Sequence, residues 1–287
     1  MKEGRKRSRL IAMVLVLVLL SGTVCALWMR PDWRFLIESA LRWKPPLDLK
    51  PILLGADCSF LTLSDLRRLP NVTETASLML VNAAHPLPND YVPTLREYNG
   101  TKMHPDMIAA YAALRDEVEA RTGMRIYVSA DYRTKEEQET LLQEGEAGTV
   151  APVGCSEHEA GLALDVYVKG YGGSAFLKTE AGRELNRICG EYGFILRYPS
   201  GKEDVTGISY EPWHLRYVGQ PHARLMMESG LTYEEYLDAL SPEVWYESGE
   251  YRILKTGWEC VAFPNGWKSC HLSKDNAGHT VITLKMS

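Results

Sequence analysis

The sequence predicts an α+β fold, in which a mainly antiparallel sheet has flanking helices and a transmembrane helix precedes the domain. Strand and helix patterns are mixed along the chain, without the strand–helix–strand rhythm of a parallel sheet. The 287 residues are 45% hydrophobic and 24% charged, which is typical of a globular protein. The net charge of −5 comes without a basic stripe among aromatic residues, which argues against nucleic-acid binding.

The N-terminus predicts a membrane anchor. Residues 1–9 contain five basic side chains, and residues 10–29 carry no charge. Twenty helical residues rise about 30 Å, which is the thickness of a bilayer core. Because basic segments stay in the cytoplasm, we expect a single-pass protein of the cell membrane whose remainder lies outside the cytoplasm. A signal peptide cleaved after Ala26 is the alternative, and it predicts the same compartment.

The rest of the chain divides where the sequence pattern changes. Residues 30–76 hold prolines and short apolar runs, and we expect a stalk or linker there. Residues 77–240 combine helix and strand signals in one domain. Residues 241–287 have a hairpin pattern and predict a C-terminal β-hairpin extension.

One turn in this extension predicts a disulfide. Pro264, Asn265 and Gly266 suit a tight turn that would place Cys260 opposite Cys270 on paired strands. In an oxidising compartment these cysteines would form a cross-strand disulfide, and two free thiols are the alternative.

Helices are predicted where a capping residue precedes an amphipathic run that closes with glycine. Residues 104–123 form such a run, which ends at Gly123. Thr134 and Glu137 make a capping box at the start of a second helix. Residues 179–193 predict a third helix, and 232–240 a short fourth one. Strands are predicted at 124–130, 162–168, 194–199 and 214–219, and we expect the last two to pair.

An ionisable side chain interrupts the predicted strand 162–168 (LALDVYV). Alternate side chains of a strand share a face, so the four aliphatic residues face the core while Asp165 points the other way. Such an aspartate either faces solvent or belongs to a site. The small Ala163 beside it, and His158 upstream across Gly161, favour a site.

A second ionisable group lies in the segment 210–219 (YEPWHLRYVG). Pro212 prevents a continuous helix, so Glu211 and His214 lie on a bent, extended segment. His158, Asp165 and His214 together would suit a catalytic zinc ion with water in the fourth position, although each histidine alone is more simply a structural residue.

Two assignments follow from this ligand set. Glu211 remains free to act as a base next to the metal. Cys155, three residues before His158, is an alternative ligand that the spacing leaves open, and we favour Asp165 because a carboxylate leaves the zinc more electrophilic.

These motifs resemble the zinc D-alanyl-D-alanine carboxypeptidase family, which includes the carboxypeptidases of vancomycin resistance. The resemblance begins with Ser156-x-His158, Gly161 and Asp165, followed by Glu211-x-x-His214. It extends over most of residues 77–287 through the segments LVNAAHPLPNDYVPTL, SADYRTKEEQ, GFILRYPSGKEDVTGISYEPWHLRYVG and LSKDNAGHTVITL.

The resemblance implies roles for individual residues. It implies zinc as the cofactor, Glu211 as the general base, and three zinc ligands: His158, Asp165 and His214. It also implies three substrate-binding residues: Arg133, Gln138 and Ser156. A planar guanidinium can hold a terminal carboxylate through two charge-assisted hydrogen bonds, which suits Arg133 to this role, although a surface charge is the simpler alternative.

The resemblance implies a peptide hydrolase, with residues 77–240 as its zinc carboxypeptidase domain. Its partners would be peptidoglycan stem peptides or their precursors, from which it removes the terminal D-alanine, and the membrane would hold its N-terminal helix. One alternative is an L,D-carboxypeptidase that acts on tetrapeptide stems. A catalytically silent wall-binding module is the other, but such a module has no need for Glu211 as a base.

Overall fold

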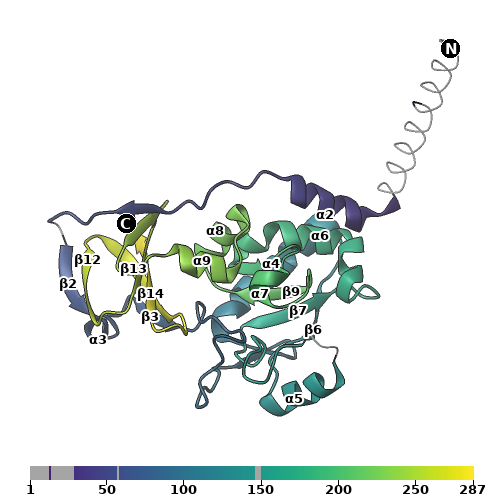
Figure 1. The fold of residues 1–287 in the computed structure, drawn as a ribbon, viewed down its shortest axis with the longest axis horizontal. Coiled ribbons are helices and arrows are strands. Elements are labelled where there is room, and N and C mark those ends of the chain that lie inside the picture. The colour runs from purple at the N-terminus through teal and green to yellow at the C-terminus, as the bar shows by residue number, and fades with distance from the viewer. Residues whose placement is uncertain (1–12, 14–28, 57, 146–149) are drawn as a thin grey trace, which may run out of the picture.

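The chain folds into two neighbouring units, each built on a sheet (Figure 1). A computed structural model describes residues 13, 29–56, 58–145 and 150–287. We call residues 96–217 the four-stranded unit. Residues 50–75 and 245–287 form the six-stranded unit, and two helices lie between the sheets. Within the described residues all strand pairs are antiparallel except one, which confirms the predicted α+β class with a mainly antiparallel sheet.

The four-stranded sheet has the order β6-β7-β9-β8. Its strands are β6 (Tyr127–Ala130), β7 (Ala163–Tyr167), β8 (Phe194–Leu196) and β9 (His214–Tyr217). The pairing of β8 with β9 confirms the expected strand pair. Leu164 and Val166 of β7 are buried in the core, as the alternating pattern predicts, and Asp165 lies on the other face. The remaining short strands are β4 (Arg96–Tyr98) and β5 (Thr101–Met103).

Helices cover the core face of this sheet. Met107, Tyr111, Leu114 and Val118 of α4 (Pro105–Thr122) recur at helical spacing and pack against the sheet. Gly123 ends α4 in the left-handed conformation, with φ of 68°. The other helices of the unit are α5 (Lys135–Glu144), η1 (Gly173–Lys178), α6 (Glu180–Ile188), η2 (Cys189–Tyr192) and α7 (Glu203–Thr206). The capping box predicted from Thr134 and Glu137 opens α5.

The six-stranded sheet has the order β1-β10-β11-β14-β13-β3, and β13 and β3 are its parallel pair. Its strands are β1 (Lys50–Ile52), β3 (Val72–Thr75), β10 (Trp245–Ser248), β11 (Tyr251–Thr256), β13 (Trp267–Lys274) and β14 (Thr280–Met286). Both of its faces are covered. Ile253 and Val281 pack toward α8 (His222–Ser229) and α9 (Tyr233–Ala239), while Leu254 and Ile282 pack on the opposite side.

The segment 30–76 is not the stalk that its irregular sequence suggested. It contains α2 (Pro31–Leu41), and its later residues form β1, β2 (Cys58–Thr62), α3 (Leu63–Leu66) and β3. β1 and β3 pair with β10 and β13 at the two edges of the six-stranded sheet. Strands of three to five residues are too short to show a period. Residues 241–287 therefore complete a sheet that begins at residue 50, rather than forming a separate extension.

The predicted Cys260–Cys270 hairpin and disulfide are wrong. β12 (Cys260–Pro264) pairs with β2, whereas β13 pairs with β14 and β3, so the turn between them joins two different sheets. Cys260 is exposed opposite Thr62, and Cys270 is buried opposite Leu284. The cysteines in the described part of the chain are all free.

The predicted transmembrane segment 10–29 lies outside the described residues, except for Met13 and Met29. Among the helices that the structure does describe, none is both long enough and apolar enough to cross a bilayer. The anchor stays a prediction from the sequence.

Candidate metal centre

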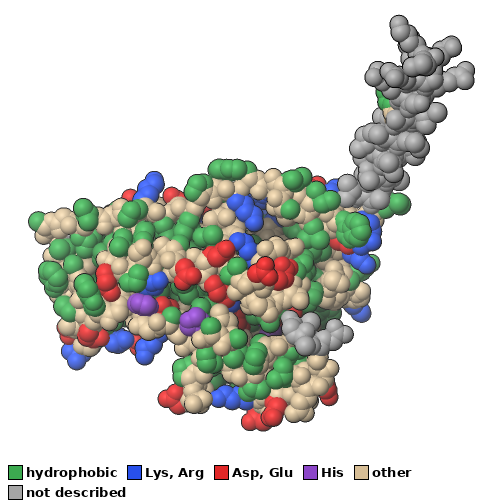
Figure 2. Space-filling view, in the orientation of Figure 1, with side chains coloured by type: hydrophobic (Ala, Val, Ile, Leu, Met, Phe, Trp, Pro, Cys, Tyr) green, Lys and Arg blue, Asp and Glu red, His purple; other side chains and the backbone are tan. Residues whose placement is uncertain are grey.

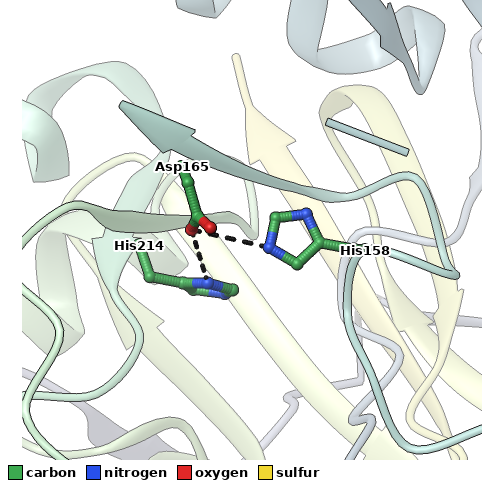
Figure 3. Close-up of side chains that lie close together, drawn as sticks. All are labelled: His158, Asp165 and His214. Atoms are coloured by element: carbon green, nitrogen blue, oxygen red, sulfur yellow. Dashed lines mark ion pairs between the residues drawn. The ribbon is translucent and has the colours of Figure 1, made fainter. Parts of the chain in front are cut away.

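Strand pairing brings three predicted ligands together (Figure 3). Asp165 of β7 lies directly opposite His214, the first residue of β9, and His158 reaches them from the loop before β7. Asp165 Oδ1 lies 3.0 Å from His214 Nδ1 and 3.5 Å from His158 Nε2. One potential ligand atom from each side chain lies within 4.8 Å of the other two. Gly161, with φ of 70°, makes the turn from the loop into β7.

The surroundings of these side chains suit a cation. Asp165 Oδ1 is buried and has no hydrogen-bond donor of its own. His158 Nδ1 lies 2.8 Å from the carbonyl oxygen of Asp131, which leaves Nε2 to face the site. His214 Nε2 faces Glu157, which leaves Nδ1 of His214 to face the site. Two oriented imidazoles and one carboxylate are the donor set of a catalytic zinc site, and the residues present fit that ion.

Cys155 takes no part in this cluster. It is buried in the loop before His158, and the metal-binding group found among the described residues consists of His158, Asp165 and His214. Burial raises the pKa of the Cys155 thiol, and the nearby Glu159 carboxylate raises it further. Because a thiolate is the ligating form, this environment disfavours Cys155 as a ligand.

Glu211 lies beside the three ligands on the bend before β9. Its Oε2 is 3.6 Å from His214 Nδ1, and its backbone N–H donates to the carbonyl of Tyr198 at 3.0 Å. Burial raises the pKa of Glu211 to about 7; His214 opposes the shift, and Asp165 adds to it. A carboxyl group with a pKa near neutrality can both accept and donate a proton at physiological pH.

The ligand charges are strongly coupled. Burial lowers the pKa of His214, but its contacts with the Asp165 and Glu157 carboxylates outweigh it and raise the value to about 10, so a bound metal would displace a proton from this ring. Burial raises the pKa of Asp165, and His158 and His214 reverse this and hold it well below its usual range. Asp165 is therefore ionised, as a metal ligand must be.

Glu157 is a residue of the site that sequence reasoning missed. Its buried carboxylate accepts from Arg197 Nε at 2.7 Å, lies 3.2 Å from Arg216 Nη1, and faces His214 Nε2 at 3.4 Å. Arg197 also pairs with Glu234 of α9, at 2.9 Å for Nη1 to Oε2. Burial raises the pKa of Glu157, but the two arginines and His214 bring it to about 2. The available signal was a charged residue within each apolar run: Arg197 after "FIL" and Arg216 in "HLRY".

The predicted substrate-binding residues lie on the loop and helix next to the ligands. Arg133 donates through its backbone N–H to the carbonyl of His158 at 3.3 Å, and its charge lowers the pKa of Glu211. Gln138 is buried, accepts from Arg133 Nη1 at 2.8 Å and donates to the carbonyl of Ala151 at 2.7 Å, so it braces Arg133. Ser156 is buried in the loop that carries His158.

Comparison with known proteins gives a consistent family. Residues 100–220 match the model described as VanY, D-alanyl-D-alanine carboxypeptidase. A D-alanyl-D-alanine carboxypeptidase of Enterococcus faecium is 35% identical over 187 residues, which span 58% of this chain and only 59% of that protein. One of Enterococcus faecalis is 32% identical over 260 residues, which cover 83% of this chain and 92% of that protein.

Solved structures extend the similarity to the fold. The vancomycin-resistance D,D-dipeptidase VanXYg, in complex with a D-Ala-D-Ala phosphinate analogue, has a TM-score of 0.62 at 27% identity, and the match covers 79% of this chain and 98% of that one. The D,D-pentapeptidase VanY, a mutant in complex with Zn(II), has a TM-score of 0.51 at 35% identity and 56% and 98% coverage. The LD-carboxypeptidase LdcB has a TM-score of 0.52 at 30% identity and 61% and 93% coverage.

Proposed function

The chain belongs to the VanY family of D-alanyl-D-alanine carboxypeptidases and is a zinc-dependent peptide hydrolase, and we propose that it removes the terminal D-alanine from peptidoglycan stem peptides. We assign His158, Asp165 and His214 as the zinc ligands and Glu211 as the general base. The observation that carries this assignment is the convergence of the three ligands, with Glu211 3.6 Å from His214.

The chain's own residues supply the proton transfers. Zinc, when bound, supplies Lewis acidity that polarises a carbonyl group and lowers the pKa of water. Glu211 takes a proton from the attacking water, whose oxygen adds to the carbonyl carbon that precedes the terminal residue. Glu211 then passes this proton to the nitrogen of the departing D-alanine as the C–N bond breaks. Burial raises the pKa of Glu211 above that of an exposed carboxyl group, which favours proton transfer in both directions.

Arg133 is the candidate for holding the terminal carboxylate of the substrate. Its guanidinium is braced by Gln138, which is itself fixed by the carbonyl of Ala151. A braced guanidinium loses less conformational entropy when it binds a carboxylate. We assign Ser156 to the wall of the same peptide site, because it lies two residues before His158.

We further propose that the enzyme acts at the cell membrane, with its catalytic domain outside the cytoplasm. The basic segment 1–9 and the uncharged segment 10–29 support this location. Stem peptides and their precursors occur in that compartment, so enzyme and substrate would meet there.

An L,D-carboxypeptidase activity is the second candidate, favoured by the similarity of the fold to LdcB. The two activities are distinguished by mass spectrometry of the full-length protein incubated with defined pentapeptide and tetrapeptide stems. We expect loss of one D-alanine from the pentapeptide, no reaction with the tetrapeptide, and no product after chelation. Cleavage of the tetrapeptide alone would support the second candidate. Absence of both products from the zinc-loaded protein would support a wall-binding module.

A further inference from the structure

The helix α2 presents different side chains to its two sides. Its inner side packs on the four-stranded unit beside η1 and α6 (Figure 1). Phe35 is only 7% exposed there, and the guanidinium of Arg187 lies 5.2 Å from the centre of its ring. Asp32 is also buried on this side and pairs with Arg30 at 3.0 Å. The contact between Phe35 and Arg187 holds α2 in a defined orientation on the domain.

The outer side of α2 carries an exposed apolar stripe. Trp33 is 53% exposed, Ile37 44% and Leu41 80%, and their spacing of four residues puts them on one face of the helix. We call these three side chains the α2 stripe. Met29 before the helix and Trp43 after it are exposed as well. Single exposed apolar residues are common. An apolar row along the outer face of a docked helix, with further exposed apolar residues at both helix ends, indicates a binding surface.

The position of the stripe in the chain identifies its partner as a lipid surface. The uncharged segment 10–29, long enough to cross a bilayer, ends four residues before Trp33. Four residues span at most about 14 Å, so a bilayer crossed by that segment would lie within reach of α2. Tryptophan favours the membrane–water interface, and basic residues favour acidic headgroups. Exposed Arg42 lies next to the stripe, as does exposed Arg34, which pairs with Glu38 at 3.5 Å.

We propose that α2 lies in the interfacial layer of the membrane, where it binds lipid through Trp33, Ile37 and Leu41 and the four-stranded unit through Phe35. The helix then fixes the orientation of the catalytic domain relative to the membrane, instead of leaving it on a flexible stalk. This inference rests on the membrane location in the proposed function and is independent of the catalytic assignments. The competing occupant of the stripe is a second copy of the chain.

Bromolipid quenching of tryptophan fluorescence tests the proposal. The full-length protein is reconstituted into vesicles of phosphatidylcholine and phosphatidylglycerol with brominated acyl chains. We expect the wild type to lose more fluorescence to bromolipid than Trp33→Phe, by about the contribution of one tryptophan. The double variant Ile37→Ser/Leu41→Ser should reduce quenching of Trp33. The control Trp258→Phe, which removes an exposed tryptophan of the six-stranded unit, should leave the quenched intensity unchanged.

Two results would overturn the proposal. The stripe faces water if Trp33 is quenched by aqueous acrylamide in vesicles and not by bromolipid. The stripe binds a second copy if Trp33 is protected from both quenchers and loses this protection when the protein is diluted into excess lipid. Activity on a soluble pentapeptide is measured with the same samples. Its absence in the wild type would contradict the proposed function, while the quenching results would still decide the role of α2.

Discussion

The core behind the metal site and the core between the six-stranded sheet and β12 differ in buried charge, although the six-stranded unit also buries Asp275 and Lys255 elsewhere. The four-stranded unit buries Glu157, Arg197 and Arg216 completely behind the proposed metal ligands. The core between the six-stranded sheet and β12 is aliphatic and aromatic, with Leu254, Leu284 and similar residues at its centre. Figure 2 shows that charged side chains are spread over the visible face of both units. Buried charges lose their hydration even when they are paired, so the site unit has a desolvation cost that the apolar core does not have.

The units are also connected by polar contacts. Glu234 of α9 pairs with Arg197, and His222 of α8 lies 2.8 Å from the Thr283 hydroxyl of β14 through its Nε2. A change in one unit can therefore reach the other through α8 and α9. If chemistry and stability are divided between the sheets as their cores suggest, substitutions in the two units should have separable effects.

The largest effect is expected for Glu211→Gln. The amide cannot accept the proton of water, so kcat should fall about 10²- to 10⁴-fold, with unchanged zinc content and thermal stability. Steady-state kinetics on the pentapeptide and metal analysis measure both. The matched control is Glu250→Gln, at an exposed carboxylate of the six-stranded unit that pairs with Lys285. Full activity of Glu211→Gln would show that another group is the base.

Glu157→Gln should weaken zinc binding and destabilise the fold. It removes the carboxylate that orients His214, which we expect to weaken zinc affinity about 10- to 100-fold. It also leaves Arg197 and Arg216 partly unpaired, at a cost of about 3 to 5 kcal/mol. Chelator competition and urea unfolding measure the two effects. Glu247→Gln is the control, because it breaks the partly exposed Arg252 pair at 2.8 Å and should cost less than about 1 kcal/mol. Equal losses in the free energy of unfolding for Glu157→Gln and Glu247→Gln would refute the contrast in buried charge between the two units.

Leu284→Ala should affect stability alone. Leu284 is fully buried in the six-stranded unit, and the cavity left by its truncation should lower the free energy of unfolding by about 2 to 5 kcal/mol. Zinc affinity and kcat should stay the same below the unfolding transition. Leu53→Ala, at an almost fully exposed position, should change stability by less than about 0.5 kcal/mol. A fall in kcat for folded Leu284→Ala would mean that the sheet also shapes the site.

The smallest expected effect is a pH dependence of the free energy of unfolding, which comes from His222 between the two sheets. Burial lowers the pKa of His222 to about 3, with a further contribution from His271, so the folded protein keeps this ring neutral. This histidine binds a proton near pH 6.5 in the unfolded chain, so the contribution of His222 to stability should fall as the pH drops below 6.5, until about pH 3. At pH 5.5 the loss should be about 1.4 kcal/mol relative to pH 7.5. Urea unfolding at both pH values measures this contribution as a difference: on going from pH 7.5 to 5.5 the wild type should change less favourably than His222→Gln, by about 1.4 kcal/mol. His214 and Glu211, whose pKa values are raised in the folded protein, act in the opposite direction in both proteins and cancel in this comparison.

Much of the four-stranded unit was predictable because its signals are local. Caps at Thr134 and Gly123 mark helix ends through hydrogen bonds between residues a few positions apart. The alternation in 162–168 placed Asp165 opposite the core face. The ligand types and their motifs indicated which side chains would meet. These features depend on neighbouring residues, and a sequence displays them directly.

The pairing of distant segments could not be predicted from local patterns. Residues 50–75 look irregular because their strands are short, and only the edges of the six-stranded sheet give them hydrogen-bond partners. The turn at 264–266 was compatible with a hairpin between β12 and β13. In the structure β12 pairs with β2 instead, and β13 pairs with β14. Glu157 became part of the site because Arg197 and Arg216 converge on it.

Local patterns were enough to predict the fold class, the helix ends and the residue types of the proposed ligands. The strand partners, the free cysteines and the charge network behind His214 depend on contacts between residues far apart in the chain. Such contacts depend on the packing of the whole molecule. A buried ion pair or a pair of strands stabilises the fold only when both partners have come together.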